Sequence, residues 1–259
     1  MNEMSTDVEW EKWGARDPYF GVITCERFRN RNLTNEAKVE FFESGRNHIN
    51  QVLETCRHHL DQNFSPKRAL DFGCGVGRLV LPLAELAEYV MGVDVSRSML
   101  AEAEKNCKEQ SLKNVSLLKS DDTLSLLEGH YFDFIHSFIV FQHLNTTRGM
   151  RIFEKLLEHL EDGGICAIQF TYSKALFRKS YGPAFLKLRD SWRKLKRLGK
   201  KVLLPFGVPS EDPEMQLNPY NLNKLLLLLQ TAGIRNSYME FTDHGGELGI
   251  FLYFQKPKD

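Results

Sequence analysis

One segment constrains the fold of this chain more than any other: an acid and three alternating glycines lie between an apolar run and an amphipathic one. The segment reads Ala69-Leu70-Asp71-Phe72-Gly73-Cys74-Gly75-Val76-Gly77-Arg78. Glycines at this spacing permit a tight turn and let a ligand lie against the backbone, near the amides of a helix N-terminus. The pattern therefore predicts a strand, a turn and a helix that bind a nucleotide-type ligand.

The spacing of the glycines excludes the usual dinucleotide fingerprint, which would require a further glycine where this chain has Arg78. The segment instead resembles the glycine motif of class I S-adenosylmethionine (SAM)-dependent methyltransferases. In this resemblance Asp71 precedes the glycines and supports the methionine end of SAM, and Gly73, Gly75 and Gly77 form the cofactor loop. The resemblance covers about residues 65–172 and implies SAM as the cofactor.

Two further acidic positions match this family in chain order. The family places an acid at the end of the second strand, where it binds both ribose hydroxyls, and Asp94 stands in that place. A carboxylate suits this task because it accepts two hydrogen bonds at once. After the third strand the family places an acid beside the adenine amino group, and both Asp121 and Asp122 fit. The remaining candidate cofactor-binding residues are Ser96, Met99 and Phe138.

Each of these acids also has a structural interpretation. Asp71 could cap a turn, and Asp94 could be an acid that precedes a helix. For Asp121 and Asp122 the alternative is N-capping of the next helix.

A histidine follows the fourth expected strand, at the edge where this fold presents reactive groups to the ligand crevice. Similar small-molecule methyltransferases often carry a histidine here. An imidazole can accept the proton that an acceptor hydroxyl loses during attack. We therefore take His143 as the candidate catalytic base, and a hydrogen bond to a loop is its structural alternative.

Outside the motif, short apolar runs alternate with amphipathic stretches, which is typical of a parallel sheet covered by helices. We expect strands at Ala69–Phe72, Tyr89–Val93, Val115–Leu118, Phe132–Phe138, Ile165–Phe170, Arg235–Phe241 and Leu248–Gln255. The expected helices are Arg78–Glu88, Arg97–Gln110, Thr147–Leu160 and Asn221–Ala232. The predicted fold class is α/β: a Rossmann-like seven-stranded sheet with helices on both faces, an N-terminal helical arm and an inserted lid-like segment.

The pattern divides the chain into four segments. Residues 1–64 form a helical and aromatic arm, with a helix from about Asn35 to Asp61 in which Gly45 is a possible break. Residues 65–172 form the SAM-binding core, 173–220 a basic and proline-rich insertion that could cover the acceptor, and 221–259 a helix and two strands that complete the sheet.

The insertion carries a strong local charge, since the run from Lys174 to Lys201 has eleven lysines and arginines and one acid, Asp190. It is either a solvated helix face, a cover over an anionic acceptor or a contact with RNA. The whole chain has no such bias, because 34 basic residues balance 34 acidic ones. No global field therefore draws it to nucleic acid or to an anionic membrane.

Other features of the composition predict a cytoplasmic protein. The first ten residues lack the basic and apolar order of a signal peptide. The run Leu225–Leu229 is far shorter than the roughly 20 apolar residues that a bilayer span needs. The five cysteines are scattered without zinc-like spacing, as in reduced cytosolic proteins, so we expect no metal site.

These observations predict a methyltransferase that acts by in-line displacement on an oxygen or nitrogen of a small-molecule acceptor, for which a phosphorylated or nucleotide-linked compound is one candidate. The chain lacks the Asn/Asp-Pro-Pro-Tyr signature of similar adenine and glutamine N-methyltransferases and the Pro-Cys pair of cytosine C5 enzymes. The alternatives are an RNA or protein methyltransferase that uses the basic insertion, and a non-catalytic SAM-binding regulatory protein.

Overall fold

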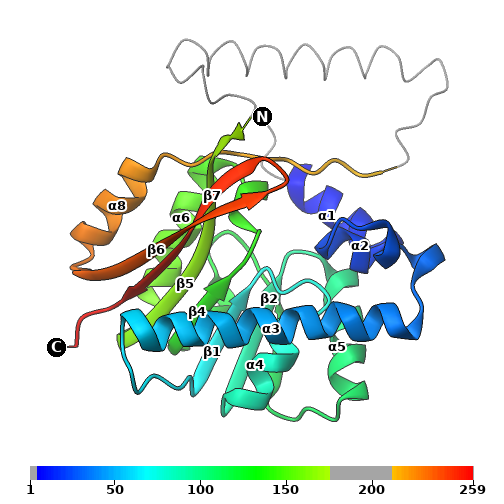
Figure 1. The fold of residues 1–259 in the computed structure, drawn as a ribbon, viewed down its shortest axis with the longest axis horizontal. Helices are drawn as coiled ribbons and strands as arrows, with labels where there is room; N and C mark the ends of the chain where they lie inside the picture. The colour runs from blue at the N-terminus through cyan, green and yellow to red at the C-terminus, as the bar shows by residue number, and fades with distance from the viewer. Residues whose placement is uncertain (1–4, 176–211, 259) are drawn as a thin grey trace.

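The computed structural model describes residues 5–175 and 212–258, and within them the chain forms one seven-stranded mixed sheet (Figure 1). Its strand order is β3-β2-β1-β4-β5-β7-β6. The strands are β1 (Arg68–Phe72), β2 (Tyr89–Asp94), β3 (Val115–Lys119), β4 (Phe132–Ser137), β5 (Leu160–Lys174), β6 (Asn236–His244) and β7 (Glu247–Gln255). Strands β1 to β5 run parallel, and β7 is antiparallel to both of its neighbours. The expected Rossmann-like α/β sheet is confirmed.

Helices cover both faces of this sheet (Figure 1). They are α1 (Ser5–Arg16), α2 (Pro18–Val22), α3 (Asn35–His59), α4 (Val80–Leu86), α5 (Arg97–Glu109), α6 (Thr146–Glu158) and α8 (Leu222–Thr231), with 3-10 turns η1 (Glu26–Phe28), η2 (Asn30–Asn32), η3 (Ser125–Leu127) and η4 (Phe141–His143). One apolar core joins α6 and α8 to the sheet, and a second joins α3 and α4 to the opposite face. None of the helices in the described part of the chain is both long and apolar enough to cross a membrane.

The position of each strand in the sheet explains its sequence pattern. Strands β1 and β2 lie inside the parallel region, where helices cover both faces of the sheet. In each of these strands four consecutive residues are buried. Strand β6 is at the edge and alternates between exposed and partly buried residues. Its Phe241 is 87% exposed, so the alternation in β6 does not bury every apolar side chain.

Helix α3 runs unbroken through Gly45, which the sequence suggested as a possible break in this helix. Gly45 is buried against the glycine loop, and a Cβ at this position would overlap the carbonyl oxygen of Arg78. The glycine is therefore needed for close packing of α3 on the loop, and the possible break at this residue is wrong.

Strand β5 is longer than expected at both ends. It begins at Leu160, which pairs with Phe132 of β4, and a register shift follows within this pairing. It ends at Lys174, which lies opposite Glu247 of β7 and forms an ion pair with it. The strand thus continues past residue 172, where we expected the core to end. Apart from Lys174 and Ala175, the basic run to Lys201 lies outside the described residues.

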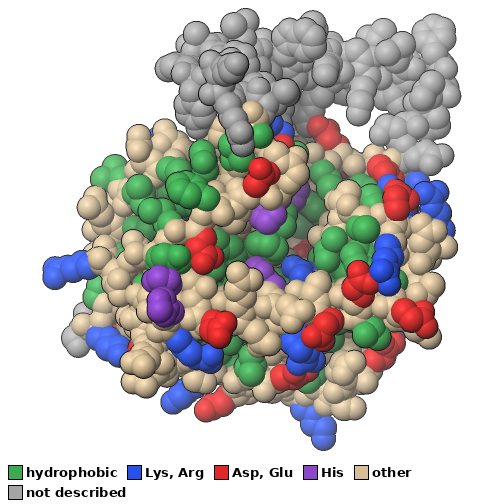
Figure 2. All heavy atoms as spheres, viewed as in Figure 1, with side chains coloured by type: hydrophobic (Ala, Val, Ile, Leu, Met, Phe, Trp, Pro, Cys, Tyr) green, Lys and Arg blue, Asp and Glu red, His purple; other side chains and the backbone are tan. Residues whose placement is uncertain are grey.

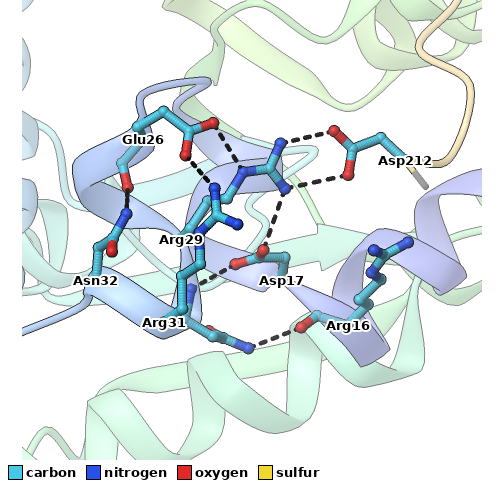
Figure 3. A network of polar contacts seen from close by, with 8 residues as sticks. Arg16, Asp17, Glu26, Arg29, Arg31, Asn32 and Asp212 are labelled. Carbon is cyan, nitrogen blue, oxygen red and sulfur yellow. Dashed lines mark hydrogen bonds and ion pairs between the residues drawn. The ribbon is translucent and has the colours of Figure 1, made fainter. Parts of the chain in front are cut away.

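The N-terminal arm packs against the glycine loop and α5 through a third apolar cluster. That cluster consists of Trp13, Tyr19, Phe20, Phe28, Ala37, Phe41, Val76 and Met99. The chain that follows residue 211 returns to the arm, where Arg29 donates to both carboxylate oxygens of Asp212 at 3.1 and 2.6 Å (Figure 3). Arg29 also donates to Asp17 at 3.3 Å and to Glu26 at 3.0 Å, so one guanidinium ties three parts of this surface together.

Candidate functional site

The candidate site lies at the carboxyl ends of β1, β2 and β4, where the parallel strands meet the glycine loop. Ligands of open α/β sheets bind outside this edge. Figure 2 shows histidine side chains inside a hollow in the middle of the face that is viewed.

The glycine loop has a backbone that other residues rarely adopt. Gly73, Gly75 and Gly77 have φ values of +78°, +53° and +86°. A Cβ at Gly75 would also lie 2.7 Å from Cγ2 of Val22 in the arm. The amides of Gly73 and Cys74 donate to the carbonyl oxygen of Val93 at 2.8 and 3.0 Å. The backbone of the loop therefore requires glycine at these three positions. The two hydrogen bonds to Val93 anchor the loop to β2.

Asp94 joins this loop to the start of α5. Its carboxylate accepts hydrogen bonds from the Gly75 and Ser96 amides, both at 2.9 Å. Burial raises the pKa of Asp94 to about 6, although these two N–H donors favour the charged form. Each oxygen keeps a further lone pair, so the carboxylate can still accept from two ligand hydroxyls.

Ser96 and Met99 lie beneath helix α1 of the arm. Ser96 caps α5 by accepting from the Met99 amide at 3.1 Å, and its hydroxyl donates to Glu11 at 2.8 Å. Glu11 also accepts from the Ser98 hydroxyl at 2.6 Å. A Cβ at Gly14 would lie 2.5 Å from the Ser96 hydroxyl oxygen, so α1 lies directly on this loop. Sequence reasoning missed Glu11 and Gly14, because an acid and a glycine in a charged helix carry no distinctive signal.

The two acids after β3 both have protein partners. Asp121 accepts from the Thr123 and Ser125 amides at 2.8 and 3.1 Å and closes the turn that leads to η3. Hydrogen bonds from the Ser125 and Thr123 hydroxyls, together with these amides, lower the pKa of Asp121 to about 2. Asp122 accepts from Nε of buried Arg148 at 2.6 Å, and the same guanidinium pairs with Asp7 of α1. Their role beside an adenine stays a prediction.

Asp71 is part of a chain of side chains that the sequence did not reveal. Its Oδ1 lies 3.0 Å from Nδ1 of His136 on β4, and Nε2 of His136 lies 3.1 Å from Nε2 of His48 on α3. The second carboxylate oxygen, Oδ2, is buried and has no hydrogen-bond partner among the described residues. The signal available in the sequence was a histidine inside an apolar strand. In the structure this strand pairs with β1, and His136 lies opposite Asp71.

Phe138 packs among histidine and arginine side chains near the end of β4. Its ring centroid lies 4.1 Å from that of His48 and 5.4 Å from that of His244, and the Arg78 guanidinium is 5.9 Å away. Arg78 is 8% exposed and donates to the Ser44 hydroxyl at 3.2 Å, while its Nε has no partner in the described structure. Burial lowers the pKa of Arg78 to about 10, which leaves it a cation at pH 7.

His143 lies in η4, directly after β4, as expected from the sequence. Its Nδ1 lies 2.7 Å from the carbonyl oxygen of Gln216, so it carries a proton that it donates there. Its Nε2 lies 3.3 Å from the Gln142 amide nitrogen, and the ring packs edge-on against Trp10. Burial lowers the pKa of His143 to about 4. Both ring nitrogens therefore have protein partners, and a catalytic role for His143 stays a prediction.

The histidines near Phe138 do not form a metal site. Over residues 5–175 and 212–258, no group of three or more histidine, cysteine, aspartate or glutamate side chains is placed to hold a metal ion. The arrangement instead offers hydrogen-bond donors and acceptors.

Comparison with known proteins identifies the central region. Residues 69–164 match a family model described as a methyltransferase domain. The chain is 34% identical over 134 residues to the probable S-adenosyl-L-methionine-dependent methyltransferase TehB of Haemophilus influenzae, which covers 50% of this chain and 46% of that protein. It is 32% identical over 71 residues to the 23S rRNA (uracil(1939)-C(5))-methyltransferase RlmD of Vesicomyosocius okutanii, which covers 27% of this chain and 16% of that protein. The chain thus spans less than half the length of either relative.

A solved structure shares the fold over nearly the whole chain. It is magnesium protoporphyrin IX methyltransferase (ChlM) from Synechocystis PCC 6803 with bound SAH, and it superposes with a TM-score of 0.57 at 19% sequence identity. The superposition covers 95% of this chain and 99% of that one. The arm and the C-terminal strands therefore lie within the shared architecture.

Proposed function

We propose, from the premise that this chain belongs to the class I SAM-dependent methyltransferases, that it binds SAM and transfers the methyl group to an oxygen or nitrogen of a small-molecule acceptor. The observation that carries the proposal is the left-handed glycine loop, which Asp94 joins to the start of α5. A four-segment division of the chain and a cytoplasmic location are parts of the same proposal.

The residues at this edge of the sheet fit the chemical groups of SAM. Asp94 would accept from the ribose hydroxyls, and Asp121 or Asp122 would lie beside the adenine. At the methionine end, the unpartnered Oδ2 of Asp71 would accept from the amino group, and the unpartnered Nε of Arg78 would donate to the carboxylate. These two buried atoms support a ligand at the site, because a buried polar atom without a partner is costly.

The protein's contribution to the reaction is mainly alignment. Bound SAM supplies an electrophilic methyl group on a sulfonium. The glycine loop and Asp94 would hold one reactant, and Phe138 with its neighbours would hold the other and exclude water. Fixing two reactants in line can supply about 7–11 kcal/mol of the barrier reduction.

A second candidate, an RNA methyltransferase, is supported by two observations. The chain is similar over a short region to an rRNA methyltransferase, and the run from Lys174 to Lys201 has eleven basic residues. The affinity for an RNA acceptor should fall steeply and log-linearly as the salt concentration rises, because many phosphates release counterions. The affinity for a small acceptor should depend only weakly on salt.

Calorimetric titration of the full chain with S-adenosylhomocysteine (SAH), the demethylated product, tests the proposal directly. We expect one binding site that SAM also occupies. Absence of binding of both compounds to the folded protein would contradict it. Binding without methyl transfer to any small molecule, RNA or protein tested would favour the non-catalytic alternative.

A further inference from the structure

Three side chains from separate elements form a hydrogen-bonded chain beside Phe138. Asp71 on β1 and His136 on β4 are 1% and 0% exposed, whereas His48 on α3 is partly exposed. The two contacts in the chain are 3.0 Å and 3.1 Å long. Since His136 is closed off from solvent, an acceptor can reach the two histidines only at His48.

The carboxylate determines the direction of these hydrogen bonds. A carboxylate only accepts, so Nδ1 of His136 carries the proton and donates it to Asp71. The other nitrogen of a neutral His136 then holds a lone pair and accepts from Nε2–H of His48. This leaves the lone pair of His48 on Nδ1, an atom for which the described residues provide no hydrogen-bond partner.

The surroundings keep His48 neutral. Burial and the nearby His136, Arg78 and His244 hold the pKa of His48 well below its usual value. These are the titratable groups that face its ring, from β4, from the loop after β1 and from β6. A proton that stayed on His48 would therefore be unstable. A proton on His136 would lie beside the Asp71 carboxylate, where an opposite charge stabilises it.

We propose that the Asp71–His136–His48 chain is a proton relay for a hydroxyl acceptor, an inference that rests on the proposed methyl transfer. The acceptor oxygen forms a bond to the methyl carbon as the carbon–sulfur bond breaks and leaves its electron pair on sulfur. The hydroxyl proton moves to Nδ1 of His48, and the proton on Nε2 of His48 moves to His136. Asp71 balances the charge until the proton returns to water after product release.

A hydroxyl is the acceptor that needs such a relay. A neutral amine already has a reactive lone pair and can release its proton after attack, whereas a hydroxyl gains reactivity when a base takes its proton in the transition state. In this arrangement His48 is the catalytic residue, and His136 and Asp71 are positioning residues. His143 is not part of the relay, because both of its ring nitrogens have protein partners.

The tautomers of the two histidines provide the first test and need no acceptor. Nitrogen NMR of the full chain with labelled histidine, with and without SAH, should show His136 protonated at Nδ1 and His48 protonated at Nε2. His48→Gln and His136→Gln assign the signals, and His143→Gln is the control that should leave them unchanged. A proton on Nδ1 of His48 would overturn the relay.

A pH titration of the same signals provides the second test. In Asp71→Asn the side chain can still accept from His136 but carries no charge, so the pH at which the histidine pair takes up a proton should fall by about one unit or more. An equal midpoint in both proteins, or no uptake in either down to about pH 4, would overturn the inference. If the variant does not fold, the tautomers of the unmodified protein decide alone.

These tests separate the relay from the proposed function. Failure of the protein to bind SAH and SAM would contradict the methyltransferase proposal whatever the histidine signals show. Wrong tautomers with intact SAH binding would remove the relay and leave methyl transfer in place.

Discussion

The two halves of the candidate site are built in different ways. In the half near β2, the Asp94 carboxylate is held by two backbone amides, those of Gly75 and Ser96. In the half near β4, Asp71, His136 and His48 come from three elements and form hydrogen bonds between their side chains. The first half depends on backbone shape, and the second depends on how two strands and a helix pack. Substitutions should therefore affect them separately.

The largest effect should come from Gly75→Val, which acts on backbone shape in the half near β2. The residue has φ of +53° and its Cβ would lie 2.7 Å from Val22, so the loop must shift. We expect a loss of SAH affinity of about 100-fold or more, because left-handed backbone and close approach are both lost. Gly129→Val is the control, since Gly129 also has a positive φ but no atom within 4 Å of its Cβ position. Equal affinities in the two variants would show that the loop does not contact the cofactor.

Asp94→Ala should have the next largest effect, because it removes the acceptor for the ribose hydroxyls. An unmet hydrogen-bonding group costs about 1–3 kcal/mol, which corresponds to about 5- to 150-fold in SAH affinity. Calorimetry of Asp162→Ala is the control, since Asp162 is an exposed acid that pairs with Lys256. The histidine NMR signals should not change in Asp94→Ala. If they do, the two halves are coupled and the comparison fails.

The pKa of Asp94 predicts how cofactor affinity depends on pH. Its pKa in the folded protein is raised to about 6, and two donor hydroxyls would favour the ionised form. Affinity for SAH should therefore be constant above that pH and fall by about tenfold per unit below it. Calorimetry between about pH 5 and pH 8 measures the slope. Asp94→Asn should remove the slope, and a slope that persists in this variant would assign it to another group.

The smallest effect should come from Glu11→Gln, which loosens the arm over the half near β2. The carboxylate of Glu11 accepts from Ser96 and Ser98, and hydrogen bonds to Ser98 and Ser96 lower its pKa although burial opposes them. The neutral amide of the variant should lower the affinity for SAH by about threefold. It should lower the free energy of unfolding by about 1 kcal/mol or less. Glu154→Gln, at an exposed position on α6, is the control. No difference between the two variants would mean that α1 does not support the cofactor loop.

The sequence predicted the parts of this protein that depend on local pattern. The parallel strands read as apolar runs because both of their faces are covered, and the glycines at 73, 75 and 77 marked a loop with left-handed backbone. Chain order placed Asp94 at the end of β2, where the structure has it. Each of these features follows from the conformations that a short stretch of residues can adopt.

Only the tertiary structure decided which distant side chains meet. Gly45 looked like a break in a helix, but it is where α3 packs on Arg78. His136 looked like part of an apolar strand, but parallel pairing places it opposite Asp71, and the packing of α3 adds His48. Asp122 and Asp7 are far apart in the chain, yet both pair with buried Arg148. The physical reason is that these contacts depend on strand register and helix packing, which arise from the whole core and leave no periodic signal in any one segment.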